Sequence, residues 1–186
     1  MGDCKWYHTL ILNFAFNFPF LQEFFEDDKN IIVESSSINQ IVNIYGCKNS
    51  TVQVKGKVNA VTLGSFHIID SDIVLAQVGI VQCAKTAVLV DSVISGISIT
   101  ASPSFAIQIT GKAPTVQLDS TDSGQIFLSR ECLDVEITSA KCSAINVSLP
   151  VEGEDEGVFV ERAVPEMLKT IIKDGHLITS IVEHSS

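Results

Sequence analysis

The 186-residue sequence contains few charged residues, and basic residues are especially scarce. Charged residues make up 18% of the chain and hydrophobic residues 46%, a balance that favours a buried core over disorder. Lysine and arginine number 12 against 22 acidic residues, so the formal net charge is −10. Because a nucleic-acid-binding protein needs a basic surface that displaces counterions from phosphates, we expect no nucleic-acid partner.

The sequence also lacks the motifs of metal sites, disulfide frameworks and common enzymes. No C-x-x-C pair and no H-E-x-x-H spacing occurs, and the number of cysteines is odd. We therefore expect no metal site and free, mostly buried thiols, as is usual in the reducing cytoplasm. G-x-S-x-G, P-loop and G-x-G-x-x-G motifs are absent too, so we predict no catalytic residues, no cofactor and no enzymatic activity.

The first 25 residues are predicted to form an atypical N-terminal extension. Residues 9–21 are strongly apolar, but this run is short and is interrupted by Asn and Pro, so we expect no membrane span. A targeting role, an extra buried strand and an error in the gene model are the alternatives for this segment.

Short alternating runs dominate residues 31–149 and predict strands with one buried face. Residues 53–63 can be laid over residues 108–118 at an offset of 55 residues, which fits about three coils of roughly 18 residues. A glycine–lysine pair occurs in both copies and predicts a corner. Short repeats must stack to bury a core, so we predict a β-solenoid in preference to a β-sandwich, because Asn-Gly and Asp-Gly hairpin signals are missing between residues 31 and 149.

The character of the sequence changes after Pro150. An acidic stretch at 152–156 is followed by apolar runs on both sides of Asp174-Gly175, which is the strongest hairpin signal in the chain. An isolated hairpin is marginally stable, so we expect it to cover another surface, in its own chain or in a partner.

Several ordered motifs resemble the C-terminal (CARP) domain of the cyclase-associated proteins. They include residues 43–57, 111–115, 128–132, 136–141, 146–150 and 164–170, and the resemblance spans nearly all of residues 26–184. It implies a right-handed parallel β-helix of about six or seven coils over residues 26–150. It also implies that residues 151–186 form an acidic linker and a C-terminal hairpin that is exchanged between two subunits of a homodimer.

The resemblance further implies a cytoplasmic protein that binds monomeric actin, prefers the ADP form, promotes nucleotide exchange and works beside cofilin. Two departures from the family pattern, residues 7–22 and 66–82, are either extra strands or come from the gene model. Two other functions remain as alternatives. One is a scaffold like the tubulin cofactors, which share this fold. The other is a carbohydrate-active β-helix enzyme, with clustered acids drawn from Asp70, Asp72, Asp91, Asp119 and Asp122, although aspartate more often marks a turn.

The resemblance also implies which residues contact the partners. The candidate actin-binding residues are Lys55, Lys57, Asn59, Lys112, Thr115, Thr121, Asp122, Ser129, Arg130, Val182, Glu183 and His184. The candidate dimer contacts are Met167, Leu168, Ile171, Ile172, Leu177, Ile178 and Ile181. A lysine taken alone is more often a solubilising residue. Lys55 follows Val54 directly, so if Val54 is buried, Lys55 points outward.

Overall fold

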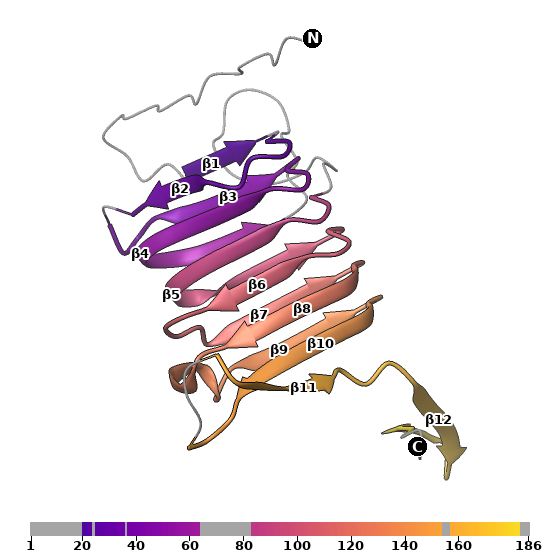
Figure 1. Cartoon of the computed structure of the whole chain (residues 1–186). Helices are drawn as coiled ribbons and strands as arrows, with labels where there is room; N and C mark the ends of the chain where they lie inside the picture. Colours follow the sequence, from indigo (N-terminus) through magenta and orange to yellow (C-terminus); the bar gives the residue numbers. More distant parts are fainter. Residues whose placement is uncertain (1–19, 24, 36, 64–82, 154–156, 183–186) are drawn as a thin grey trace.

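Parallel strands stacked one above another form the body of the described structure (Figure 1). The computed structural model describes residues 20–23, 25–35, 37–63, 83–153 and 157–182. Within them the elements are β1 (Phe20–Glu23), β2 (Ile31–Glu34), β3 (Ile41–Tyr45), β4 (Thr51–Leu63), β5 (Ala87–Thr100), β6 (Ala106–Ile109), β7 (Thr115–Asp119), β8 (Asp122–Leu128), the 3-10 helix η1 (Arg130–Cys132), β9 (Glu136–Ala140), β10 (Ser143–Pro150), β11 (Phe159–Ala163), β12 (Leu168–Lys173) and β13 (His176–Ile181).

The strands form two faces. Face A contains β2, residues 51–54 of β4, residues 87–90 of β5, β6, β8 and β10. Face B contains β1, β3, residues 60–63 of β4, residues 96–100 of β5, β7 and β9. Every pairing within a face is parallel, and the chain alternates between the faces, so the predicted β-solenoid is confirmed. The predicted number of coils stays a prediction, because residues 64–82 lie outside the described residues.

Two edges join the faces. We call residues 55–59, 91–95, 110–114 and 129–135 the corner edge, where the chain passes from face A to face B. We call residues 46–50, 83–86, 101–105, 120–124 and 141–144 the turn edge, where it returns. The predicted glycine–lysine corners are confirmed, since both pairs lie on the corner edge.

Branched aliphatic side chains form ladders in the core. On face A, Val54, Val90, Ile109 and Leu128 occupy paired positions of successive strands, and all four are buried. Burying one side chain of this kind, relative to leaving it exposed, stabilises the fold by about 1.5–3 kcal/mol. Because side chains alternate along a strand, the residue after Val54 points outward, as predicted for Lys55.

The internal repeat lies in register, but the prediction of three coils between its two copies was wrong. Gln53 pairs with Leu89, and Leu89 pairs with Gln108, so two pairing steps connect the copies. The first step contains residues 64–82, and the extra length of that segment explains why the offset of 55 residues suggested a third coil.

The N-terminal end of the solenoid departs from the predicted domain boundary, and the C-terminal end departs from the parallel arrangement of the strands. β1 pairs with β3, so the solenoid includes residues on the N-terminal side of the predicted boundary at residue 26. At the other end β11 runs antiparallel to β10, and Phe159 packs edge-on against Phe127 with ring centroids 5.5 Å apart. The predicted C-terminal hairpin is confirmed as β12 and β13, joined at Asp174-Gly175, where both residues have positive φ.

A candidate protein-binding groove

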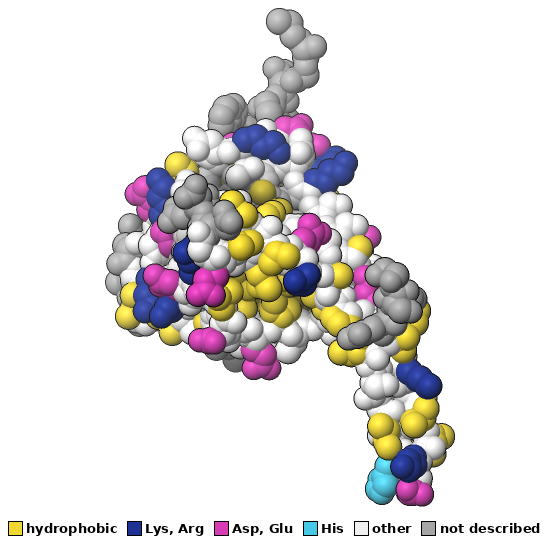
Figure 2. All heavy atoms as spheres, turned by 60° about the horizontal axis from the view of Figure 1, so that its bottom comes forward, with side chains coloured by type: hydrophobic (Ala, Val, Ile, Leu, Met, Phe, Trp, Pro, Cys, Tyr) yellow, Lys and Arg dark blue, Asp and Glu magenta, His cyan; other side chains and the backbone are white. Residues whose placement is uncertain are grey.

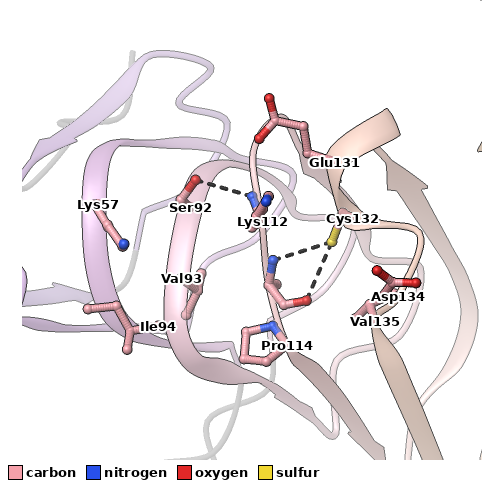
Figure 3. A pocket seen from close by; sticks show the side chains of 11 residues that line it. Lys57, Ser92, Val93, Ile94, Lys112, Pro114, Glu131, Cys132, Asp134 and Val135 are labelled. Carbon is pink, nitrogen blue, oxygen red and sulfur yellow. Dashed lines mark hydrogen bonds between the residues drawn. The ribbon is translucent and has the colours of Figure 1, made fainter.

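A groove of about 550 Å³ runs along the corner edge (Figure 3). Its lining comes from four successive corner segments and consists of Lys57, Ser92, Val93, Ile94, Lys112, Ala113, Pro114, Glu131, Cys132, Asp134 and Val135. Two of the predicted actin-binding lysines are therefore brought together, although they lie far apart in the sequence. The groove is open, and both apolar and charged side chains reach it.

Local backbone geometry places the two lysines. Gly56 has φ +85°, a left-handed conformation that L-residues with side chains rarely adopt, and Lys57 follows it. At Gly111 the constraint is space, because an added Cβ would lie 2.0 Å from Ser92 Oγ and 2.4 Å from the carbonyl oxygen of Asp91. The Lys112 amide then donates to Ser92 Oγ at 3.1 Å. Glycine is thus required before Lys57 by the backbone conformation and before Lys112 by the lack of space for a side chain.

Lys57 and Lys112 are exposed and form no ion pair within the described residues, where the ion pairs are Lys48 with Glu26 and Lys55 with Glu34. Lys55 Nζ lies 3.8 Å from Glu34 Oε1. The chain has an excess of acid, so cations without an acidic partner are available to a negatively charged binding partner. Lys55 is the weaker candidate, because it already faces a carboxylate.

The floor of the groove is apolar and contains a buried thiol. Cys132 is 2% exposed, and its sulfur lies 3.3 Å from the Ala113 nitrogen and 3.5 Å from the Ala113 oxygen. Burial raises the pKa of the Cys132 thiol, and the hydrogen bond from the Ala113 amide opposes this rise. A thiol held neutral in this way packs as a small apolar group and is a poor nucleophile.

The sequence reasoning missed the apolar wall and the acidic end of the groove. Ile94 is 42% exposed although it belongs to a strand with a well-formed core face. The sequence does contain a signal for the exposure of Ile94, because Val93 and Ile94 are adjacent apolar residues at a corner, where both cannot face the core. In the structure only Val93 is buried. Glu131 and Asp134 lie at and just after η1, and both are exposed.

Four other predicted residues lie on or beside the corner edge and make hydrogen bonds within the solenoid. Asn59 accepts a hydrogen bond from Ser95 Oγ at 2.6 Å. The hydroxyl groups of Thr115 and Ser129 donate to the carbonyl oxygens of Ser95 and Gly111, at 3.1 Å and 2.5 Å. The guanidinium of Arg130 donates to the carbonyl oxygen of Val151 at 3.3 Å. These bonds hold neighbouring corner segments in place around the groove.

Thr121 and Asp122 do not join the groove, because they lie on the opposite, turn edge. Thr121 is 3% exposed, and its hydroxyl donates to the carbonyl oxygen of Ser102 at 2.7 Å. A side chain buried in this way cannot contact a partner directly, so we omit Thr121 from the proposed surface. Asp122 is exposed, but it begins β8 on the far side of the solenoid from the lysines.

Of the three predicted C-terminal contacts the structure describes Val182, which lies at the base of the hairpin. The Val182 amide donates to the carbonyl oxygen of Met167 at 2.9 Å, while Glu183 and His184 lie outside the described residues. One face of the hairpin is strongly apolar, and its exposed side chains are Leu168 62%, Ile172 79%, Leu177 74% and Ile181 56%. Ile171 and Ile178 form a smaller apolar pair on the other face.

Apolar side chains also gather at the C-terminal end of the solenoid, which Figure 2 brings forward. The half-buried residues there that pack against the core include Val135, Ile137, Leu149 and Val164. β9 has a single described neighbour, β7, so its other edge presents unpaired backbone groups. The hairpin and the end of the solenoid are thus two exposed apolar surfaces in one chain.

Of the five aspartates considered for a carbohydrate-active enzyme, the structure describes three, and these three do not form one cluster. Asp91 lies on the corner edge, where it accepts hydrogen bonds from the Gly56 amide at 2.7 Å and from Thr110 Oγ1 at 3.3 Å. Asp119 and Asp122 lie at the turn edge, and Asp70 and Asp72 are outside the described residues. Within the described part of the chain, no three His, Cys, Asp or Glu side chains are grouped so that they could hold a metal ion.

Comparison with known proteins decides the family. The family model described as adenylate cyclase associated (CAP) C terminal matches residues 19–69 and 69–184. This chain belongs to the cyclase-associated protein family. The resemblance expected from the sequence motifs is therefore confirmed, and the match to the C-terminal domain begins one residue before β1.

Two similar proteins of the cyclase-associated protein family are considerably longer than this chain. The chain is 34% identical to adenylyl cyclase-associated protein 1 of Homo sapiens over 158 residues, which cover 85% of this chain and 29% of the human protein. It is 35% identical to the Dictyostelium discoideum protein over 162 residues, covering 87% of this chain and 31% of that protein. The chain thus spans about 30% of the length of these relatives.

A solved cyclase-associated protein has the same fold. The crystal structure of cyclase-associated protein from Cryptosporidium parvum matches with a TM-score of 0.74 and 29% sequence identity, over 88% of this chain and 90% of that chain. Among the described residues of our chain, none form a helix of the length and apolarity needed to cross a membrane.

Proposed function

We propose that this chain binds actin monomers through the corner-edge groove and promotes their nucleotide exchange during filament turnover. Membership of the cyclase-associated protein family supports actin as the partner. The observation that carries the choice of site is the pair of exposed lysines, Lys57 and Lys112, in a groove with an apolar floor on an acidic chain. Complementary charge at such a site steers association and fixes orientation.

The exchange activity needs no covalent chemistry. A ligand shifts a conformational equilibrium only by its differential affinity for the two states. If the chain binds an open, nucleotide-poor state of actin more tightly than the closed state, it lowers the barrier to ADP loss, and ATP then binds. This mechanism requires contacts with actin alone, which is consistent with a binding surface that has no reactive group. We place this activity in the cytoplasm, where it would cooperate with cofilin. Cys47, Cys83, Cys132 and Cys142 are not in disulfides, which agrees with a reducing compartment.

We also propose that two copies of the chain form a homodimer by exchanging their β12–β13 hairpins. The two-stranded sheet of the hairpin pairs with no other described strand, and isolated hairpins are marginally stable in water. Its apolar face would be buried on the C-terminal end of the partner's solenoid, where Ile137, Leu149 and Val164 are half-buried. Exchange of an identical element is a low-cost route to a two-fold dimer, and it would place two grooves in one particle.

Release of a fluorescent nucleotide from ADP-actin monomers, with and without the chain, tests the proposed function. We expect release to accelerate with increasing concentration of the chain and then to saturate. A chain with both Lys57 and Lys112 changed to alanine should need a higher concentration to reach the same rate. Unchanged release at saturating wild-type chain would rule the function out, and binding to tubulin instead would favour the scaffold alternative.

A further inference from the structure

The charge of the corner-edge groove changes sign along the solenoid axis (Figure 3). Lys57 comes from the first of the four corner segments, and Lys112 comes from the third. Glu131 and Asp134 come from the fourth segment, at the end nearer the C-terminus. None of these four side chains forms an ion pair within the described residues, so both ends of the groove offer charges that a partner can neutralise.

Strand spacing gives the length of the groove. The four corner segments stack in order, because Lys57 pairs with Ser92, the Gly111 amide donates to the carbonyl oxygen of Asp91, and Ser129 donates to Gly111. Neighbouring parallel strands lie about 4.8 Å apart, so three steps separate the first and last segments by roughly 14 Å. This length is matched by roughly ten residues of α-helix or four to five residues of extended chain.

An apolar strip (Ile94, Pro114 and Val135) lines the groove alongside the charged residues. Ile94 is 42% exposed, and it lies between the two lysines in the order of the segments. Pro114 and Val135 continue the apolar lining toward the acidic end. An exposed isoleucine between Lys57 of the first segment and the acids of the fourth segment is suited to a bound segment with an apolar side chain in its middle and charged residues at its two ends.

We propose that the groove binds one short amphipathic segment of the actin monomer in a fixed direction, with the acidic end at Lys57 and the basic end at Glu131 and Asp134. This inference rests on the proposed function, and it adds the chemistry and the orientation of the bound segment. Its distinctive consequence concerns the acids. A partner surface that is simply acidic would be repelled by Glu131 and Asp134, whereas a segment with a basic end is attracted by them.

Charge reversal at each end separates these two cases. The experiment measures the Kd for ADP-actin monomers at several salt concentrations for K57E/K112E and for E131K/D134K. We expect each double variant to raise Kd by about three- to thirtyfold, because each removes two exposed charge pairs, and we expect the effect to shrink at high salt. The matched controls K85E/K141E and D119K/E161K make the same change in net charge at exposed positions away from the corner edge, and they should change Kd less than twofold.

The apolar strip has its own matched pair. Ile94 and Ile32 are exposed to almost the same extent, 42% and 43%, but Ile32 lies on face A outside the groove. We expect I94A to raise Kd by about five- to thirtyfold, as for a central contact residue, while I32A leaves it unchanged. At the acidic end, the neutral variant E131Q/D134N replaces E131K/D134K if the charge-reversed chain unfolds. We expect it to raise Kd too, but by less than the charge reversal does.

Each result supports or overturns the inference. Weaker binding by both charge-reversed variants and by I94A supports it. If E131K/D134K binds as tightly as wild type or more tightly, or if I94A binds normally, the directional segment is wrong while actin binding stands. If the wild-type chain does not bind actin monomers, the proposed function and this inference both fail.

Discussion

Lys55 and Lys57 flank Gly56, yet their side chains face different surroundings. Lys55 continues the outward row of face A and lies 3.8 Å from Glu34, whereas Lys57 lines the corner-edge groove and forms no ion pair within the described residues. Gly56 separates them with φ +85°, and its amide donates to Asp91 at 2.7 Å. The two lysines of one short motif are therefore expected to contribute unequally to binding.

The first prediction compares single alanine variants of these lysines. K57A should raise the Kd for ADP-actin several-fold, since exposed charge pairs are worth about 0.2–1 kcal/mol and the loss of one is not compensated within the chain. K55A should change the Kd less, because its charge is already offset by Glu34. Isothermal titration or fluorescence binding at low salt measures both values. An equal or larger effect of K55A would contradict the assignment of the site to the groove, which Lys57 lines and Lys55 does not.

The second prediction concerns Thr121, which the family resemblance placed among the binding residues. T121V keeps the shape of the side chain but removes the hydroxyl that donates to the carbonyl oxygen of Ser102. We expect a loss of about 1–3 kcal/mol in the free energy of unfolding, because a buried acceptor loses its donor, and we expect an unchanged Kd for actin. D122A at the exposed neighbour should change stability by less than about 0.5 kcal/mol. Urea denaturation measures both variants, and normal stability with weakened binding in T121V would contradict the structural role.

Much of the fold could be predicted because its local signals agree with one another. Alternation along the strands matched the burial of Val54 beside the outward Lys55, and Asp174-Gly175 matched the hairpin turn. Alternation says which side chains point outward, but it does not say which edge of a solenoid a loop residue joins. Thr121 and Lys112 were therefore grouped together, although they lie on opposite edges.

The groove itself could not be predicted from sequence patterns, because residues from four stacked corner segments form it. Lys57 and Glu131 are brought to one surface by the parallel register of intervening coils, and the offset between coils is irregular across residues 64–82. Ile94 could have been recognised, since it follows an apolar neighbour at a corner where only one of the two can be buried. The ion pair of Lys55 with Glu34 likewise depends on which residues of β2 and β4 face each other.

The third prediction tests the packing of the turn edge at Gly124. An added Cβ there would lie 2.1 Å from Phe105 Cε1 and 2.8 Å from Ile145 Cδ1, distances at which atoms must move. G124A should therefore lower the free energy of unfolding by about 1–3 kcal/mol through overpacking. Adding F105L, which removes the ring that crowds the site, should recover part of this loss, and the double-mutant cycle should be non-additive. Additive effects would show that the ring is not the source of the strain.

The fourth prediction concerns the thiols in a chain whose Cys4, outside the described residues, has been changed to serine. Cys142 is half-buried, whereas Cys47, Cys83 and Cys132 are buried, and burial also raises the pKa of the Cys132 thiol. Because the thiolate is the reactive species, Cys142 should react with a thiol reagent first at pH 8, and Cys132 should react only as the chain opens. Mass spectrometry of the labelled peptides over time measures the order. Rapid labelling of Cys132 would mean that the floor of the groove is open to solvent.

The fifth prediction tests hairpin exchange through the most exposed apolar pair among the residues that the structure describes. Ile172 and Leu177 face each other across β12 and β13, with 79% and 74% of their surface exposed. If their face covers the end of a partner's solenoid, I172D/L177D would bury two carboxylates without partners, and the dimer should dissociate to monomer. Light scattering after size exclusion measures the mass. The control S180D adds a charge on the other face of the same hairpin and should leave the dimer intact. A wild-type chain that is monomeric at tens of micromolar, or a dimer unaffected by I172D/L177D, would overturn the exchange.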